Sequence, residues 1–486
     1  MEALQRLHNR GSISTGYEID NSLKFEEDNL EAVYAQPTAD GNQRTWTVSM
    51  WFKRTELGVS GAYNTLITAL VGAETGSVYI TPTDEIICDV GLGGTRNRQQ
   101  TAMKFRDTSA WYHIVWRVDT TQGTAADRHR LYVNGVLQEW TTIDGYPDQN
   151  FQSNWNNNYP IYIGCYSTYN NYGFNGYIAE VHHTDGVSNA PTEFGEFDED
   201  SGIWKPKAYT GSYGAQGFYL PFDDSSNLGT NAQGNDVNFT LQNITAADQA
   251  TDTPTNNFCT LVGDQQFVPS KSTTLVREGG TIMHGGQNPG AYSTMGVRRG
   301  KWYFESTLLH LGGVGAENHG FGVIAADRLY DMNIAGEDIG ADVGGWACAG
   351  NANPRNNNSG ASGANYLTAP GINVVLGCAL DMDNGKIWWH NAGTWHSLNS
   401  TVGNPANGTS PAWSNLLTAT DDFVLPAAGL YANGAGPERA MNFGGYALPA
   451  FTAVGTYSDA NGYGSFSYAP PSGYYALCTK NLEEFG

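Results

Sequence analysis

Hydrophobic and polar residues alternate along several short stretches of this chain. In residues 45–54 (TWTVSMWFKR), Trp46, Met50 and Phe52 fall on one side of an extended chain. The other side carries Thr, Ser and Lys, with Trp51 as the one bulky exception. A period of two is typical of a β-strand with one buried face. We therefore predict a half-buried antiparallel strand over these residues.

The same alternation recurs in both halves of the chain. Residues 111–119 (WYHIVWRVD) repeat it in the first half, and 301–307 (KWYFEST) carry it in the second. No stretch of a dozen residues holds the 3.6-residue period of a helix, so helix content should stay below about a fifth, against a norm of about 30–35%. The predicted fold class is all-β, with two antiparallel β-sandwich (jelly-roll) domains joined by a polar connector. The side chains expected in the two cores are Trp46, Met50, Phe52, Ile114, Trp116, Ile163 and Val181, and Trp302, Phe304, Leu376, Leu380 and Trp389.

Two similar hairpins stand about 250 residues apart, at 130–140 (RLYVNGVLQEW) and 387–397 (IWWHNAGTWHS). An Asn-Gly pair suits a two-residue type I′ turn, because both central residues need positive φ. A polar, acidic stretch rich in Asn, Thr and Gly separates the hairpins, with one short strand expected at 237–241. The predicted parts are an N-terminal arm (1–22), a first sandwich (23–222), a connector (223–268), a second sandwich (269–478) and a tail (479–486).

Composition narrows the class of protein. The 486 residues include 60 Gly, with 12% aromatic and only 15% charged residues, which suits strands and turns. The formal net charge of −23 argues against nucleic acid, whose phosphates attract Lys and Arg. No apolar run approaches the roughly 18 residues of a membrane span, and the first residues lack the apolar core of a secretion signal. We therefore expect a soluble protein without membrane insertion or a cleaved leader.

Six cysteines are scattered along the chain without a CxxC pair. A disulfide framework or a zinc site would cluster them. We expect buried free thiols at Cys88, Cys165, Cys259, Cys348, Cys378 and Cys478.

Five motifs in the first half occur in the order found in one known fold. They are TWTVSMWFKR (45–54), AWYHIVWRVDTT (110–121), RLYVNGV (130–136), IYIG (161–164) and NGYIAEVHHTDG (175–186). Their succession resembles the concanavalin-A-like, laminin-G type jelly roll over roughly residues 23–222. This resemblance implies a lectin-like sandwich.

The second half carries a different set of motifs. They are GKWYFEST (300–307), HGFGVIAAD (319–327), VVLGCALDMDNGKIWWHNAG (374–393) and MNFGG (441–445). Together they resemble a SPRY domain over roughly residues 270–478, and the block at 376–393 is the most specific.

The pairing of both domains resembles a virion structural protein of tailed bacteriophages, of the tail-fibre or appendage kind. The segments RGSISTGYEIDNSLKF (10–25), DTPTNNFCTL (252–261) and PPSGYYALCTKNL (470–482) add to that resemblance. It implies a virion location after synthesis in the host cytoplasm. The implied partners are other virion proteins, further copies of this chain in a homo-oligomer, and a glycan of the host surface.

Catalysis would require paired carboxylates. Glycoside hydrolases of the concanavalin-like fold carry them on one strand, about 5–5.5 Å apart for retention. Glu180 shares a predicted face with Ile178 and His182 and has no acidic neighbour there, so a structural hydrogen bond is expected. The nearest acidic cluster lies beyond the last strand of the sandwich, in GEFDEDSG, at Glu196, Asp198, Glu199 and Asp200. We predict no catalytic residue and no enzyme activity, with a glycan hydrolase as the alternative.

No metal site or cofactor is predicted. His182 and His183 are adjacent on a strand, so they point to opposite faces. His390 and His396 flank the second hairpin and could face each other, but no third ligand is evident. Calcium stays open, because the loops at 144–150 and 223–227 are rich in oxygen donors that offer no basis for a choice.

Exposed aromatic and amide side chains remain as binding groups, because sugars stack on aromatic rings and hydrogen-bond to amides. The ligand-binding candidates are Trp155, Tyr166, Tyr169 and Tyr172 in the first half, and Trp346, Arg355, Tyr366 and Trp413 in the second. These residues could instead cover the sandwich edge or pack on a neighbouring subunit. We predict a non-enzymatic virion protein (fibre, appendage or decoration) with lectin-like surfaces, or else a purely structural virion part.

The N-terminal arm, residues 1–22, has too few apolar side chains to form a domain, since each yields only about 1.5–3 kcal/mol when buried. It carries Arg6 and Arg10 on an otherwise acidic chain. We predict that it docks on another subunit or virion protein. The alternative is that it folds back along its own sandwich.

Overall fold

The structure is a computed structural model that describes residues 16–57, 63–71, 74–92, 95–167, 172–235, 237–263, 275–285, 290–313, 319–329, 339, 344–349, 354–356, 359–360, 364–365, 371–398, 401–420, 422–430, 436–446, 448–452 and 454–486. The chain divides into two compact units, residues 13–256 and, after a boundary at Asn256–Asn257, residues 257–486. Strands make up 43% and helices 8% of the structure, which confirms the all-β prediction.

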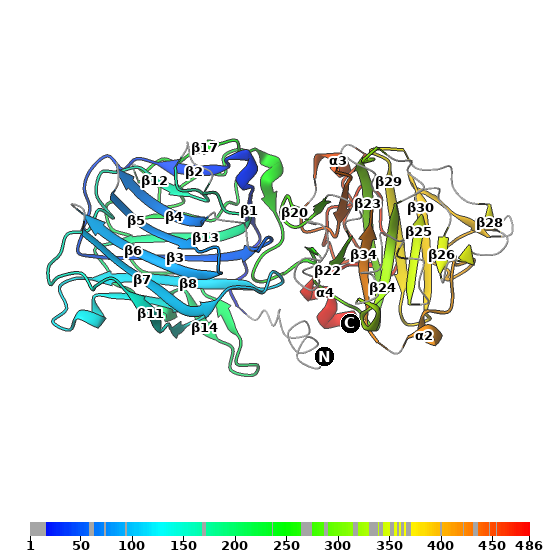
Figure 1. Cartoon of the computed structure of the whole chain (residues 1–486), viewed down its shortest axis with the longest axis horizontal. Coiled ribbons are helices and arrows are strands. Elements are labelled where there is room, and N and C mark those ends of the chain that lie inside the picture. The colour runs from blue at the N-terminus through cyan, green and yellow to red at the C-terminus, as the bar shows by residue number, and fades with distance from the viewer. Residues whose placement is uncertain are drawn as a thin grey trace. The chain divides into compact units, whose positions relative to one another are not determined.

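Two antiparallel sheets form the first unit (Figure 1). Sheet A runs in the order β10 (Val136–Leu137), β9 (His129–Val133), β8 (Trp111–Asp119), β3 (Thr45–Arg54), β13 (Gly176–Asp185), β1 (Ser22–Phe25) and β18 (Gln249–Ala250), with β16 (Phe218–Leu220) also on β13. Sheet B runs in the order β11 (Trp140–Ile143), β7 (Thr95–Lys104), β6 (Glu85–Leu92), β5 (Glu74–Ile80), β4 (Asn64–Val71), β12 (Ile161–Ile163), β2 (Ala32–Ala35) and β17 (Thr240–Gln242). Short 3-10 turns are η1 (Glu27–Asn29), η2 (Ala125–Asp127), η3 (Pro191–Glu193) and η4 (Ala246–Asp248).

The core of the first unit lies between the two sheets and centres on three tryptophans. The ring centroids of Trp46 and Trp116 are 4.5 Å apart, and Trp155 lies 5.3 and 5.4 Å from them. Edge-to-face and tilted pairs of this kind add to the energy of simple burial. All seven side chains predicted for this core are buried in it, so the core prediction is confirmed.

Much of the segment expected as a connector at 223–268 is part of the first unit. Strand β17 extends sheet B by pairing with β2, and β18 extends sheet A by pairing with β1. Leu228, Val237 and Phe239 are buried in the first core. The burial of these few apolar side chains therefore holds a largely polar stretch against the sandwich of the first unit.

The second unit also contains two large sheets. Sheet C runs in the order β19 (Leu261–Gly263), β22 (Gly290–Ser293), β34 (Val424–Gly429), β24 (Gly320–Ala325), β25 (Gly345–Ala349), β26 (Pro354–Asn356) and β27 (Ser359–Gly360). Sheet D runs in the order β20 (Leu275–Arg277), β21 (Ile282–His284), β35 (Glu438–Asn442), β23 (Lys301–His310), β29 (Val375–Asp381), β30 (Lys386–Asn391) and β31 (Thr394–Trp395), with β36 (Tyr475–Ala476) parallel to β23. A small sheet joins β28 (Ala364–Asn365), β32 (Ser397–Leu398) and β33 (Thr401–Val402), and the remaining helices are η7 (Ala326–Arg328), α2 (Leu416–Ala419), α3 (Pro449–Thr452) and α4 (Thr479–Phe485).

The five residues predicted for the second core are all buried in it, which confirms that prediction too. The residues expected as a tail form α4, whose Leu482 is buried in the same core. Both hairpins close through two-residue turns with positive φ, at Asn134 and Gly135 (47° and 78°) and at Ala392 and Gly393 (48° and 79°).

The strand at 45–54 is buried on both faces, so the prediction of a half-buried strand is wrong. Residues 187–217 supply the second covering layer, including the small hairpin of β14 (Gly195–Phe197) and β15 (Trp204–Pro206). Trp204 stacks on His113 at 5.9 Å and donates its indole N–H to Nδ1 of that ring at 3.0 Å. On the other side, His113 stacks on Trp51 at 4.6 Å. Trp51, the exception in the sequence pattern, thus stacks on the ring that the cover contacts.

The described part of the N-terminal arm lies on its own sandwich. The Tyr17 hydroxyl donates to Glu180 Oε2 at 2.8 Å, and the buried Ile19 donates its N–H to Thr255 Oγ1 at 3.1 Å. Docking of the arm on a partner stays a prediction for residues 1–15, which lie outside the described residues.

Candidate binding face

One row of side chains crosses the outer face of sheet B. The register pairs each member with the next across adjacent strands. From β7 to β2, the row consists of Arg98, Asp89, Ser77, Thr68, Tyr162 and Tyr34. Their neighbours along the strands, such as Cys88, Val78 and Ile67, face the core. Side chains alternate along a strand, so the members of this row, called the β7–β2 row here, face away from the core.

The middle of the β7–β2 row holds two hydroxyls that lie directly opposite each other, on Thr68 and Ser77. Both side chains are fully buried, and neither hydroxyl has a hydrogen-bond partner among the described residues. A buried polar group without a partner costs about 1–3 kcal/mol. Neither hydroxyl is accessible from the surface, because both side chains are 0% exposed.

A charged pair adjoins these hydroxyls. Arg98 donates from Nη2 to Asp89 Oδ2 at 3.2 Å, and its guanidinium lies 5.8 Å from the centroid of the Tyr79 ring. The pair cancels in formal charge. The row therefore offers directional hydrogen-bonding groups without a net charge of its own.

Tyrosines gather at one end of this face. Thr65 N donates to the Tyr172 carbonyl at 3.3 Å, which holds residue 172 beside β4. Tyr63 then lies 5.1 Å from Tyr79 and 6.0 Å from Tyr172 between ring centroids, and Tyr166 lies 6.0 Å from Tyr172. Tyr63 and Tyr172 are 39% and 38% exposed. Their rings offer flat apolar faces to a ligand.

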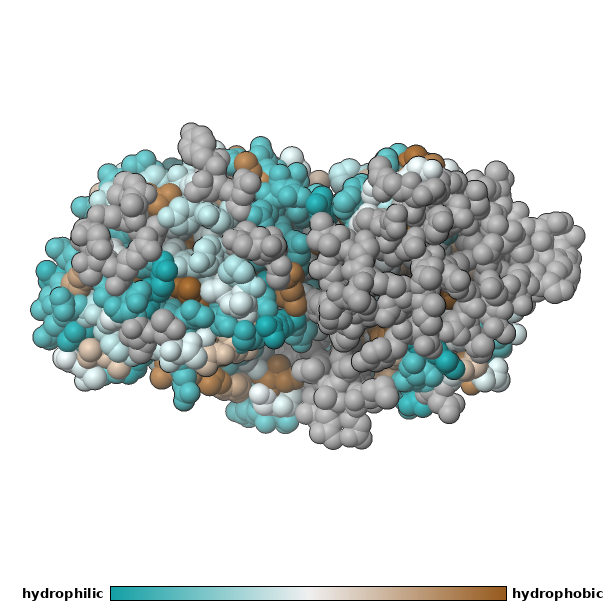
Figure 2. Space-filling view, in the orientation of Figure 1, coloured by the Kyte–Doolittle hydropathy of each residue, from teal (hydrophilic) through white to brown (hydrophobic). Residues whose placement is uncertain are grey.

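A second aromatic pair lies at the β2 end of the row, where Tyr34 and Tyr162 stack at 5.8 Å. The first group lies beside the middle of the row, with Tyr79 on β5, so Thr68 and Ser77 are the row members between the two sets of rings. This arrangement suits a ligand that has apolar faces and hydrogen-bonding edges, as a sugar ring does. Figure 2 shows that hydrophilic and intermediate residues predominate on the visible described surface of this unit.

Two of the predicted ligand-binding residues belong to the cores and must be withdrawn. Trp155 is fully buried against Trp46 and Trp116, and Trp346 is fully buried in the second core, where its indole N–H donates to Asn415 Oδ1 at 2.9 Å. A buried indole offers no face to a sugar. Trp155 stands in a polar stretch of sequence, so its burial follows from tertiary packing that the local pattern does not reveal.

The other candidates have different positions. Tyr166 is half-buried and Tyr172 is exposed, and the structure brings these two together as predicted. Trp413 is half-buried against the second core. Tyr169 and Tyr366 lie outside the described residues, and of Arg355 the structure describes only the backbone on β26.

Sequence reasoning missed Tyr63, Tyr79, Thr68 and Ser77. A signal was available in the residues around 77–80 (SVYI), where Ser77 and Tyr79 alternate with Val78 and Ile80. This signal was not enough alone. A period of two shows which residues share one face of a strand, but it does not show which other strands lie beside that strand in the sheet.

The acidic cluster at 195–202 forms a hairpin turn. Asp198 Oδ1 accepts hydrogen bonds from the backbone N–H and the hydroxyl of Ser201, both at 2.8 Å. These bonds, together with Lys205 at 3.3 Å, lower the pKa of Asp198 to about 2. A carboxylate held ionised in a turn is poorly suited to donate a proton in glycoside hydrolysis.

Glu180 has the structural role expected of it. Its carboxylate accepts the hydroxyls of Tyr17 at 2.8 Å and Tyr219 at 2.7 Å. Its backbone, at φ 52°, forms a bulge in β13. The bulge moves Glu180 to the covered face, opposite to Ile178 in the core, which corrects the face predicted for these two residues. Glu180 does share a face with His182 as predicted, with Oε2 3.4 Å from His182 Nε2.

The histidines do not assemble a metal site. His182 stacks on Tyr219 at 4.4 Å on the outer side of sheet A, while His183 packs on Trp155 at 5.8 Å, so their opposite orientation is confirmed. His390 is opposite Trp395 in the second hairpin, so His396 lies on the other face and the two do not meet. No cluster of three or more His, Cys, Asp or Glu in the described part of the chain could hold a metal ion.

Two further predictions can be compared with the structure. All six cysteines are buried and free, which confirms the expected thiols. Within the described residues, no helix is both long and apolar enough to cross a membrane.

Comparisons with known proteins agree with the fold. Residues 28–191 match the family model of the Concanavalin A-like lectin/glucanases superfamily, of laminin G type. The match lies within the first unit and agrees with the antiparallel β-sandwich observed there. No curated protein matches the chain.

Two solved structures are similar in fold. The SPRY domain of human HERC1 has 16% identity and a TM-score of 0.27, covering 36% of this chain and 95% of that one. A native heptameric SAP-like pentraxin from Limulus polyphemus has 12% identity and a TM-score of 0.27, covering 36% of this chain and 80% of that one. At these values neither structure bears on what this chain binds.

Proposed function

We propose that this chain is a non-enzymatic binding protein whose first unit holds an uncharged glycan on the outer face of sheet B. The observation that carries the proposal is the pair of exposed tyrosines beside β4, Tyr63 and Tyr172, whose ring centroids are 6.0 Å apart. Their rings would stack on the faces of a sugar ring. Thr68 and Ser77 are fully buried, so a ligand on the surface would not reach their hydroxyls.

The absence of net charge in the row favours a neutral ligand. Arg98 is matched by Asp89, and the chain as a whole carries a formal charge of −23. An acidic polysaccharide would meet long-range repulsion and no unmatched cation in the row. The ligand class is thus a neutral hexose-type glycan.

The proposed setting is the virion of a tailed bacteriophage, where the chain would act as a fibre, appendage or decoration protein facing the host surface. This part rests on the resemblance of the sequence segments at 10–25, 252–261 and 470–482. Residues 1–15 would supply the attachment to other virion proteins. Mass spectrometry of purified particles, with immunogold labelling, would place the protein or exclude it.

Binding is tested on an array of neutral bacterial oligosaccharides, with the full chain and three variants. Tyr63→Ala and Tyr172→Ala should each reduce binding at least tenfold, because each removes an exposed ring that would stack on the sugar. Tyr457→Ala, which removes a 47% exposed ring in the second unit, is the matched control and should bind like the parent. Equal binding by all four proteins would exclude this face, and reducing-sugar release from any bound glycan would exclude a non-enzymatic role.

A further inference from the structure

A buried lysine of β1 lies between two carboxylates in the first unit. Lys24 Nζ is 3.0 Å from Asp248 Oδ1 and 3.0 and 3.1 Å from the two oxygens of Glu31. All three side chains are buried. Desolvating one cation and two anions is expensive, so this group calls for a chemical explanation as well as a structural one.

Both carboxylates are held in fixed positions. Asp248 Oδ2 accepts the Thr245 backbone N–H at 2.7 Å and its hydroxyl at 3.1 Å, as part of the capping box of η4. Glu31 Oε2 accepts the Glu26 N–H at 2.9 Å, and Oε1 accepts from Asn29 at 3.2 Å. The Lys24 amine therefore meets the Asp248 carboxyl group at the close, fixed range that favours reaction between neighbouring groups.

The environment also provides a proton carrier. Burial raises the pKa of Glu31 to about 7, although Lys24 acts in the opposite direction. Glu31 can thus take a proton near neutral pH. Burial equally disfavours the ammonium form of a lysine, and a neutral amine is the nucleophilic form.

We propose that Lys24 and Asp248 join through an amide bond, formed by the folded protein itself. Lys24 Nζ attacks the Asp248 carboxyl carbon while the Thr245 N–H stabilises the charge on Oδ2. The ammonium group loses two protons, and Glu31 relays both to Oδ1, which leaves as water. The C–N bond forms and the C–Oδ1 bond breaks. Glu31 returns to its starting state, so no oxidant or further reactant is needed.

The bond would link the first strand of the unit to the segment that leads into its last strand. β1 and β18 are neighbours in sheet A, and residues 24 and 248 enclose almost the whole unit. Such a link would hold the two ends of the sandwich together against a pulling force. It is independent of the proposed glycan site on sheet B.

The intact mass of the denatured full-length protein tests the proposal. The expected mass is that of the sequence less one water. Tryptic mapping should then find a branched peptide that joins Lys24 to Asp248, with no cleavage after Lys24. A mass equal to that of the unmodified sequence, or a loss of water located at other residues, would overturn the proposal.

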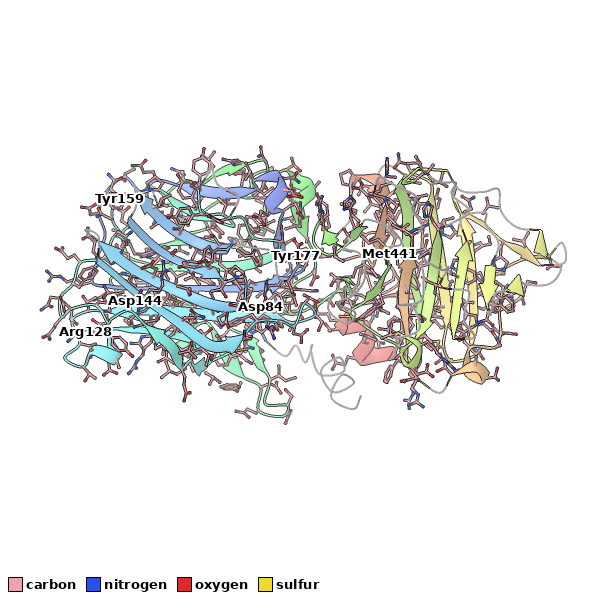
Figure 3. The ribbon with its side chains drawn as sticks, in the orientation of Figure 1. Asp84, Arg128, Asp144, Tyr159, Tyr177 and Met441 are labelled. Atoms are coloured by element: carbon pink, nitrogen blue, oxygen red, sulfur yellow. The ribbon has the colours of Figure 1, made fainter. Side chains whose placement is uncertain are left out.

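Variants assign the roles. Glu31→Gln and Asp248→Ala should each have the mass of its own sequence, with no loss of water. Glu31→Gln leaves both residues of the proposed bond, Lys24 and Asp248, unchanged. The matched control is Lys53→Arg, at a second buried pair where Lys53 Nζ lies 2.7 Å from Asp252 Oδ2 and 6.0 Å from the centroid of the Tyr177 ring. Figure 3 labels Tyr177. The Lys53→Arg variant should keep the loss of one water. If Glu31→Gln kept it too, the relay through Glu31 would be wrong.

Discussion

The two outer faces of the first sandwich differ in how the rest of the chain covers them. The outer face of sheet A is sealed by residues 187–217, whose aromatic rings pack on His113 and His182. The outer face of sheet B carries exposed tyrosines and a polar row in which two hydroxyls lack partners among the described residues. On the sealed face, the hydroxyls of Thr47 and Ser49 have hydrogen-bond partners, whereas those of Thr68 and Ser77 on sheet B have none among the described residues.

In the second unit, the chain likewise covers the outer face of one of the two large sheets. Residues 443–478 cover the outer face of sheet D, where Phe466 packs edge-on against Tyr303 at 5.2 Å and Tyr474 lies 6.5 Å from Trp388. Glu305 fastens that cover by accepting the backbone N–H groups of Ser467 and Tyr468, both at 2.8 Å. A chain segment that follows the last long strand thus closes one face of each sandwich.

Acid should destabilise the folded first unit through buried histidines that are not part of the β7–β2 row. Burial lowers the pKa of His113 and His129 to about 3 and that of His183 to about 4. Because these folded-state values lie below the unfolded value of about 6.5, the stabilisation is complete above pH 6.5 and is lost as the pH falls toward 3. Each histidine should cost about 1.4 kcal/mol per pH unit in that window.

Urea unfolding of the full chain at pH 7 and pH 5 checks this expectation. The transition of the first unit should move to much lower urea at pH 5. His113→Gln, which cannot titrate, should reduce the pH-dependent part by about a third. Equal midpoints at the two pH values would mean that these histidines are solvated in the folded protein.

Removing the main ring of the cover should destabilise the first unit strongly. Trp204→Ala leaves a cavity over His113 and removes an indole hydrogen bond, and large-to-small changes of this kind cost about 3–5 kcal/mol. Phe197→Ala, which removes an adjacent ring that is 50% exposed, is the matched control and should cost less than about 1 kcal/mol. Thermal unfolding measures both, and similar losses in the two variants would contradict a sealed face on sheet A.

These contrasts also show what the sequence could predict. Period-two patterning identified both cores because it is a local property, and Trp51 already marked a second contact on the covered face. Trp155 could not be placed, because its burial depends on Trp46 and Trp116 from distant strands. The β7–β2 row was also beyond reach, since it depends on the register of six strands that are not all consecutive in sequence.

Removing a buried hydroxyl should change the stability of the first unit in opposite directions on the outer faces of sheet A and sheet B. Thr68→Val and Ser77→Ala remove buried hydroxyls without partners in the described structure, so each should leave stability unchanged or raise it by about 1 kcal/mol. Thr47→Val on the sealed face removes a hydroxyl that donates to the Val187 carbonyl at 2.9 Å and accepts the Asn189 N–H at 2.8 Å. It should lose about 1–2 kcal/mol. A loss of that size in the sheet B variants would show that their hydroxyls already have partners.

The smallest effect on stability is expected for the exposed rings. Tyr63→Ala and Tyr172→Ala should change the free energy of unfolding by about 0.5 kcal/mol or less, as surface changes usually do. Calorimetry of both variants checks this value. A loss above about 2 kcal/mol would assign these tyrosines to the fold rather than to a ligand.

Hydroxyl-radical footprinting of the full chain, with and without a glycan identified on the array, tests the central claim most directly. The account predicts that Tyr63 and Tyr172 become protected when the glycan is bound. Phe197, which belongs to the cover of sheet A, and Tyr457, which belongs to the second unit, are 50% and 47% exposed and should keep their reactivity as internal references. Protection of Phe197 or Tyr457 without protection of Tyr63 and Tyr172 would contradict the assignment of the binding face to sheet B.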